Sequence, residues 1–230
     1  MKILKLLTAG ILIFSVAIGY GATTGKRQST TITALSNDAN GIFEDQTGTA
    51  ITLDGALVAG GVATSSAAQQ VSIEGTGNNS GITFAIVGTD ADGKAHSETL
   101  TGANNGTATT TLYFKTVTSI TPSGAITGNV EGGWLSANGA VSASLVPDLA
   151  GYTALMSIVV DSCTCTYTVE HTSYNTPSAA DQLWFSTVGL TSQTADAEGN
   201  VVAPVGGLRL KLTAYTSGSA TLTILQANNR

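Results

Sequence analysis

Histidine and cysteine are the residue types in this sequence that could most directly carry out chemistry, and each occurs only twice. His96 or His171 could act as the general base of a Ser-His-Asp hydrolase, since one well-held imidazole is enough for that reaction. The motif Gly-x-Ser-x-Gly, which exposes the nucleophile of many hydrolases, does not occur. We therefore expect both histidines to be polar residues at strand edges or subunit contacts, and we expect no enzyme and no catalytic residue.

The second candidate is Cys163-Thr164-Cys165, which has the spacing of half a metal site. A structural zinc ion needs four ligands, and there is no second pair of cysteines to supply them. Residues two apart on a strand share a face, so both thiols would lie on the side of Tyr167 and Val169. The opposite face would carry polar residues, Thr164, Thr166, Thr168 and Glu170. The sequence therefore predicts two small core residues, without a metal and without a disulfide framework.

Acidic residues could bind calcium or hydrolyse glycosidic bonds. Asp90-Ala91-Asp92-Gly93 resembles the start of a calcium-binding loop, but the residues that would complete such a loop are missing. Asp-Gly between two alternating segments is typical of a tight hairpin turn, which we expect here instead. Fifteen acidic residues allow many carboxylate pairs, so the sequence neither supports nor excludes a glycosidase. No cofactor is predicted, since phosphate- and dinucleotide-binding motifs are absent.

The elements that would position these residues are strands. Alternating apolar and polar residues, interrupted by Gly, Asn and Asp, fill the chain after residue 25 and predict an all-β protein. The expected strands are Thr30–Ala34, Ala50–Leu57, Gln70–Glu74, Ile82–Gly88, His96–Thr101, Thr109–Lys115, Thr118–Thr121, Val141–Leu145, Ala154–Asp161, Cys163–His171, Leu183–Thr187, Leu208–Tyr215 and Ala220–Leu225. Turns are expected at Glu198-Gly199-Asn200 and at Thr216-Ser217-Gly218.

The last long strands show the clearest alternation. Leu208, Leu210 and Leu212 would point into a core, while Arg209 and Lys211 would point away from it. The larger aromatic residues are expected as core or interface anchors: Trp134, Trp184, Tyr113, Phe114, Tyr152, Tyr167, Tyr174 and Phe185.

We expect two β-sandwich or jelly-roll modules, residues 26–133 and 134–230, after a hydrophobic segment over residues 1–25. The boundary is placed where Gly132-Gly133, residues 136–139 and Pro147-Asp148 would loosen the chain. A single elongated β-domain is the alternative.

The hydrophobic segment has the features of a secretory signal peptide. Two lysines lie within residues 1–5, an uncharged apolar run follows, and cleavage could occur after Gly19 or Gly21. An uncleaved anchor or a buried helix is the alternative reading. Contact with a membrane is expected only through this segment, if it is retained.

Composition and charge exclude some classes of partner. Only 10% of the residues are charged, against about 25% in a typical soluble domain. The net charge is −6, and the nine basic residues are scattered along the chain. We therefore expect no nucleic-acid binding, which needs a basic surface, and no attachment to anionic lipid through the folded part.

Two groups of segments resemble proteins of tailed bacteriophages. Residues 81–94, 97–102 and 113–120 resemble a β module that recurs in phage virion proteins. Residues 166–172, 204–205, 208–210 and 213–226 resemble a small β protein encoded among phage head genes, of the capsid cement or decoration kind. The resemblance implies a packing role in a virion, with self-association and contacts to major capsid or tail proteins.

The expected function is accordingly that of a virion structural protein, either a cement or decoration subunit or a fibre-like one. The apolar N-terminal segment keeps a second hypothesis open, a secreted extracellular filament or adhesin subunit. A secreted carbohydrate-active enzyme or lectin is a third.

Overall fold

The computed structural model describes residues 26–147, 153–173, 183–202 and 205–226, which form thirteen β-strands. All of their pairings are antiparallel. The prediction of an all-β protein is confirmed, while the jelly-roll order of the strands stays a prediction. The predicted N-terminal segment, residues 1–25, lies outside the described residues. Within those residues there is no helix with the length and hydropathy of a membrane span.

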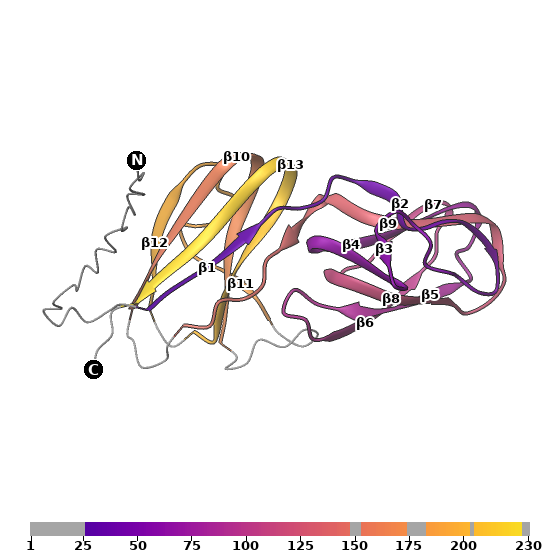
Figure 1. The fold of residues 1–230 in the computed structure, drawn as a ribbon, viewed down its shortest axis with the longest axis horizontal. Coiled ribbons are helices and arrows are strands. Elements are labelled where there is room, and N and C mark those ends of the chain that lie inside the picture. Colours follow the sequence, from indigo (N-terminus) through magenta and orange to yellow (C-terminus); the bar gives the residue numbers. More distant parts are fainter. Residues whose placement is uncertain (1–25, 148–152, 174–182, 203–204, 227–230) are drawn as a thin grey trace, which may run out of the picture.

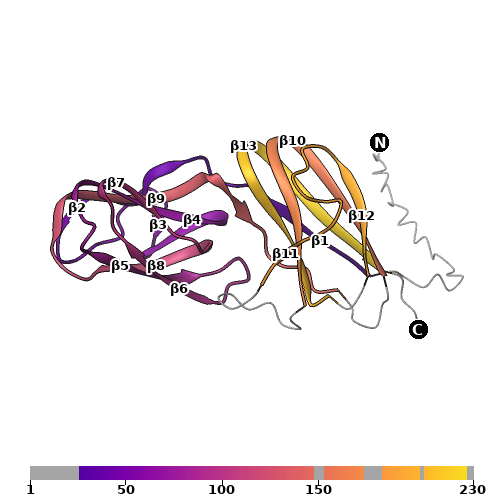
Figure 2. The ribbon, with the colours of Figure 1, turned by 180° about the vertical axis from the view of Figure 1, so that it is seen from behind.

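Figures 1 and 2 show two lobes that follow one another along the long axis of the molecule. The first lobe contains β2 (Asp38–Gly48), β3 (Val58–Ala59), β4 (Val62–Asn78), β5 (Thr83–Thr89), β6 (Ala95–Thr101), β7 (Asn104–Thr109), β8 (Phe114–Pro122) and β9 (Ile126–Val141). Alternation along these strands directs apolar side chains into one core, whose largest members are Phe43, Phe84, Phe114 and Trp134.

The second lobe contains β1 (Lys26–Ile32), β10 (Thr153–Thr172), β11 (Phe185–Ser186), β12 (Ala197–Val202) and β13 (Gly207–Gln226). Leu208, Leu210 and Leu212 are fully buried in its core, as their spacing predicts. The lobes share one hydrogen-bonded sheet, because Ala140 and Val141 at the end of β9 pair with β13 on one side and with β4 on the other.

Two segments belong to the other lobe from the one that the predicted boundary between residues 133 and 134 would give them. β1 pairs along its whole length with β13, and Ile32 lies in the core of the second lobe. Trp134 lies in the core of the first lobe. Pairing of the first described strand with the last is a long-range contact that local periodicity does not reveal.

Gly132 and Gly133, expected in a loose boundary, lie inside strand β9. A Cβ atom on Gly132 would overlap the Phe43 ring, and one on Gly133 would overlap the backbone of Asp38 and Ala39. The glycines therefore let β2 approach β9 closely, which is a known use of glycine within strands. The prediction that these two residues loosen the chain at a boundary is wrong for this reason.

β10 and β13 are long bent strands, where the sequence predicts two shorter strands in each case. Gly218, with φ +85°, lies within β13 at the predicted turn, and Ser162, with φ 49°, lies within β10. The pairing register between the two strands shifts between Asp161 and Thr164. A shift of this kind is a β-bulge, which bends a strand without ending it.

Other differences concern segments whose strand character depends on a partner. Ala50–Leu57 is the connection from β2 to β3, and residues 110–113 connect β7 to β8. Glu198-Gly199-Asn200, predicted as a turn, lies inside β12 and pairs with β10. Strand preference is set largely by cross-strand packing, so local pattern alone places these segments poorly.

Gln69 of β4 holds the chain where it crosses from the second lobe to the first. Its side chain is fully buried, and its Oε1 accepts hydrogen bonds from the Leu35 amide at 2.8 Å and the Ser65 hydroxyl at 2.7 Å. Its Nε2 donates to the carbonyl oxygens of Leu35 at 3.2 Å and Leu135 at 3.4 Å. Because Leu35 lies between β1 and β2, this one side chain fixes the crossing segment.

Two further polar contacts lie near the crossing. Within the first lobe the Lys115 Nζ donates to the carbonyl oxygens of Ser65 and Ser66, at 2.7 Å each, and burial lowers the pKa of this lysine. The Asp92 carboxylate of the β5–β6 turn accepts from the Ser144 amide at 2.8 Å and from its hydroxyl at 2.5 Å, and so ties the first lobe to the segment that leads into the second. Together with the shared sheet, this second contact makes the two lobes one elongated body.

Candidate interaction surface

His96 of β6 is buried against the core of the first lobe. Its ring meets the Phe114 ring edge-on, with 4.8 Å between the ring centroids and 64° between the planes. Neither ring nitrogen has a hydrogen-bond partner within the described part of the chain. Burial lowers the pKa of the imidazole, although the carboxylates of Asp90 and Glu98 act in the opposite direction. His96 is therefore a packed core residue, not the polar contact residue predicted.

His171 lies on β10 in the second lobe, so the structure does not bring the two histidines together. Its Nδ1 is 3.2 Å from the Thr187 Oγ1, and its ring centroid is 6.0 Å from that of Phe185. The half-buried ring thus connects β10 to β11. His171 pairs with Phe185 of β11 on one side and with Leu208 of β13 on the other, so it does not lie at the predicted strand edge.

Glu170, next to His171, is the centre of a charged cluster that the sequence analysis did not identify. Its Oε2 accepts from the Arg209 Nε at 2.7 Å, and its Oε1 lies 3.4 Å from the Lys211 Nζ. The Arg209 guanidinium also lies over the Trp184 ring, 4.1 Å from its centroid. Glu170 is buried, so the face predicted as polar is partly covered. Alternation places Arg209 and Lys211 on one face, but only the β10–β13 register places Glu170 opposite Arg209 and diagonal to Lys211.

Cys163 and Cys165 form a disulfide, and this corrects the prediction of two separate core thiols. In a regular strand residues two apart are about 6.6 Å apart along the axis. The bulges around Thr164 bring the two Cα atoms to 5.3 Å, within the range that disulfides span. The strand irregularity that permits this bond cannot be seen in the alternation of the sequence.

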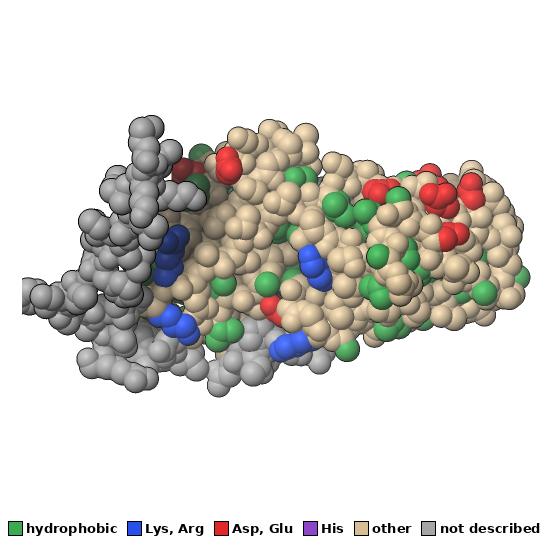
Figure 3. All heavy atoms as spheres, in the orientation of Figure 1, with side chains coloured by type: hydrophobic (Ala, Val, Ile, Leu, Met, Phe, Trp, Pro, Cys, Tyr) green, Lys and Arg blue, Asp and Glu red, His purple; other side chains and the backbone are tan. Residues whose placement is uncertain are grey.

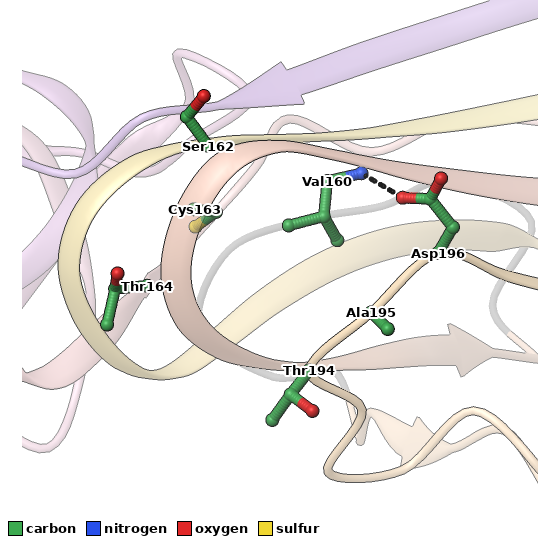
Figure 4. A pocket seen from close by; sticks show the side chains of 7 residues that line it. All are labelled: Val160, Ser162, Cys163, Thr164, Thr194, Ala195 and Asp196. Atoms are coloured by element: carbon green, nitrogen blue, oxygen red, sulfur yellow. Dashed lines mark hydrogen bonds between the residues drawn. The ribbon is translucent and has the colours of Figure 1, made fainter.

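An open groove lies beside the disulfide, and Figure 4 shows the side chains that line it. They are small residues from β10 and from the segment before β12: Val160, Ser162, Cys163, Thr164, Thr194, Ala195 and Asp196. The Asp196 carboxylate, the only ionisable side chain among these seven apart from the bonded cysteine, accepts a hydrogen bond from the Val160 amide at 2.8 Å. The groove thus offers no pair of groups for acid-base catalysis.

The predicted hairpin at Asp90 is confirmed. β5 and β6 pair in register across it, and the Asp90 carboxylate accepts hydrogen bonds from the amides of Asp92 at 2.9 Å and Lys94 at 2.8 Å. Gly93 has φ +75°, which glycine adopts without strain. The Asp90 carboxylate therefore holds the turn, which explains Asp-Ala-Asp-Gly without a calcium ion.

Acidic side chains gather at the end of the first lobe that lies away from the second (Figure 3). Glu131 lies opposite Glu74 on neighbouring strands. Partial burial raises the pKa of Glu131, and the nearby carboxylates of Glu74, Asp45 and Glu44 raise it further. Even so, the described residues contain no group of three potential ligands placed to hold a metal ion.

The strands β12, β10, β13 and β1 lie side by side in this order and form a sheet in the second lobe. Its inner face carries Met156, Ile158, Leu222 and Ile224, which are buried in the core. Its outer face carries Leu155, Val159 and Leu225, which are 40%, 51% and 46% exposed. Leu155 and Leu225 are directly paired across β10 and β13, and Val159 lies further along β10 on the same face, beyond Ser157.

We refer to Leu155, Val159 and Leu225 as the aliphatic row. Small and hydroxyl side chains surround it on the same face, namely Ser157, Thr221 and Thr223. A row of this kind on an open sheet face can be buried by a flat partner, whereas a reaction needs convergent polar groups. The residues described here therefore present an interaction surface more clearly than a catalytic site.

A scan against protein-family models, a search of curated proteins and a search of solved structures each gave no match to this chain.

Proposed function

We propose that this chain is a non-enzymatic structural protein of a bacteriophage virion, a cement, decoration or fibre-like subunit that packs on a capsid or tail lattice. The observation that carries the proposal is the aliphatic row on the outer face of the second lobe. Burial of apolar surface contributes about 25 cal/mol per Å², so a contact in which a flat partner covers these side chains would be stabilised.

The construction of the body supports the same role. Its buried and partly buried polar side chains hold strands and lobes in place, as Gln69, Asp92 and Glu170 do. A body with fixed lobes can repeat on a lattice, where many weak contacts add up to strong attachment. The segments that resemble phage virion proteins include β5, β6 and the second half of β13, all of which are strands paired within the sheet.

Purified phage particles from the host that encodes the chain provide the test. We expect peptides of this chain, at constant copy number, in particles banded in a density gradient and labelled by an antibody against it. Val159→Asp should abolish incorporation, because it places a charge in the aliphatic row. The matched control is Val188→Asp, since Val188 is 97% exposed and lies outside the row. Absence of the chain from particles, or normal incorporation of Val159→Asp, would refute the proposal.

The disulfide favours a second candidate, a subunit of a secreted filament or adhesin. Disulfides persist in oxidising compartments and are rare in the cytoplasm, where phage heads assemble. Mass spectrometry of the natural protein separates the candidates. A chain that begins near Ala22, with Cys163 and Cys165 resistant to alkylation, supports secretion. A chain that begins at Met1 or Lys2, with both thiols alkylated, supports the virion.

A further inference from the structure

The sheet that carries the aliphatic row ends in two open strand edges. β1 pairs only with β13 and β12 pairs only with β10 among the described residues. Neither pairing contains a register shift, and neither strand contains proline. Natural proteins protect edges with bulges, proline, charged side chains or a covering segment. Of the first three, the two edges have only charged side chains, and these are of opposite sign on β1 and β12. Both edges thus have the regular backbone that an added strand requires.

The directions of the two strands permit pairing between copies. Each neighbour in the order β12, β10, β13, β1 is antiparallel, so β12 and β1 run in opposite directions. A second copy placed beside the first in the same plane would bring its β12 antiparallel to β1. The lengths agree as well, with seven residues in β1 and six in β12.

The charges of the two edges are opposite. β1 begins with the exposed Lys26 and Arg27, and β12 carries the exposed Glu198. No ion pair within the described part of the chain involves these three side chains. The register places Arg27 level with Leu225, Leu155 and Asn200, so Arg27 and Glu198 lie on the same outer face.

We propose that β1 of one copy pairs with β12 of a second copy of this chain, which extends the sheet from subunit to subunit. This inference rests on the proposed structural function and specifies the partner of the sheet. In the register of the existing sheet Arg27 would lie opposite Asn200, and Glu198 would be its diagonal neighbour. Diagonal neighbours are about 7–8 Å apart between Cα atoms, within reach of long side chains.

Charge distinguishes this arrangement from two-fold pairing. A full-length antiparallel pair of two β1 strands would place Arg27 opposite Thr31, and a pair of two β12 strands would place Glu198 opposite Val201. Neither pair gains an attraction between opposite charges, whereas β1 with β12 places Arg27 beside Glu198. The contact is therefore head-to-tail, and such contacts build open filaments unless the rotation between subunits closes a ring.

Self-association of the purified full-length chain tests this inference. Sedimentation velocity over a concentration series would be measured at an ionic strength of about 0.01 M, where charges act over about 30 Å. We expect open-ended oligomers that grow with concentration. Arg27→Glu or Glu198→Arg alone should raise the concentration for half assembly roughly fivefold to tenfold. The double variant with both changes should assemble like the natural chain.

The control is Glu44→Arg, which makes the same charge change on the exposed surface of the first lobe. It should assemble normally, and circular dichroism should give unchanged melting for every variant. A natural chain that stays monomeric, a double variant that does not recover, or a control that fails equally would overturn the inference. The particle experiment does not depend on this assay, so the proposed function can stand when the edge pairing fails.

Discussion

Replacing Gln69 by methionine tests whether one buried side chain fixes the crossing between the lobes. Methionine keeps the length of the side chain but removes all four hydrogen bonds that Gln69 makes with Leu35, Ser65 and Leu135. The Leu35 amide and carbonyl then lose the partners that the amide group of Gln69 supplied. We expect the chain to fold but to be less stable.

The magnitude follows from the groups left without partners. A buried polar group that loses its hydrogen bond costs about 1–3 kcal/mol. The amide and carbonyl of Leu35 are the two groups most affected, because the Ser65 hydroxyl can rotate and the contact to Leu135 is long at 3.4 Å. Taking about 1.5 kcal/mol for each group gives a loss of about 3 kcal/mol in the free energy of unfolding.

Urea unfolding followed by tryptophan fluorescence measures the loss, and hydrogen exchange of the Leu35 amide measures its local origin. Exchange of that amide should be faster in the Gln69→Met chain than in the natural chain, and this increase should exceed the increase for amides within the described strands. The control is Gln193→Met, since Gln193 makes one exposed side-chain hydrogen bond, to the Thr191 carbonyl. The control should lose at most about 0.5 kcal/mol. A loss below 1 kcal/mol for Gln69→Met, with the Leu35 amide still protected, would refute the reasoning.

Three further substitutions test other parts of the structure. His96→Phe removes an imidazole whose pKa is lowered from 6.5 by burial. The unfolded chain therefore binds a proton at His96 more tightly than the folded chain does, so the free energy of unfolding of the natural chain falls as the pH drops below about 6.5. Urea titrations at several pH values should show a smaller fall for the variant. Glu170→Gln leaves Arg209 and Lys211 without their carboxylate and should cost about 2 kcal/mol in urea unfolding. Gly133→Ala overlaps the backbone of β2 and should cost about 3 kcal/mol, measured by thermal melting.

Each of these has its own comparison. The His96 prediction is contradicted when the natural and substituted chains lose stability in parallel between pH 6.5 and about pH 5. For Glu170 the comparison is Glu198→Gln, an exposed site where the loss should stay within about 0.5 kcal/mol. For Gly133 it is Gly81→Ala, where a Cβ meets open space. Equal losses in either pair would show that the named contact is not the cause.

The candidate surface could be predicted only in part. The segment that carries Leu155 and Val159 is predicted as a strand, but alternation does not say that alternate apolar residues face solvent. Both faces of this part of β10 are apolar in sequence, and only the sheet around it decides which face meets the core. The cluster of Glu170 with Arg209 and Lys211 could be predicted only from the register between β10 and β13, because Glu170 and Arg209 are 39 residues apart in the sequence. Sequence separation of that size leaves no local signal.

What the sequence determined by itself is the class of structure and its local turns. Alternation along the chain is enough to specify strands, because side chains of a strand point alternately to two faces. The hairpin at Asp90 was specified as well, since Asp and Gly there meet a local conformational need. The inward direction of Leu208, Leu210 and Leu212 follows from the same period.

Only the tertiary structure decided which strands are neighbours. It placed β1 beside β13, joined β10 and β13 into long bent strands, and brought Cys163 and Cys165 close enough to bond. It also turned Gly132 and Gly133 from an expected loose boundary into the site where β2 closely approaches β9. The physical reason is that a strand satisfies its backbone hydrogen bonds only with a partner, and the choice of partner depends on the packing of the whole chain.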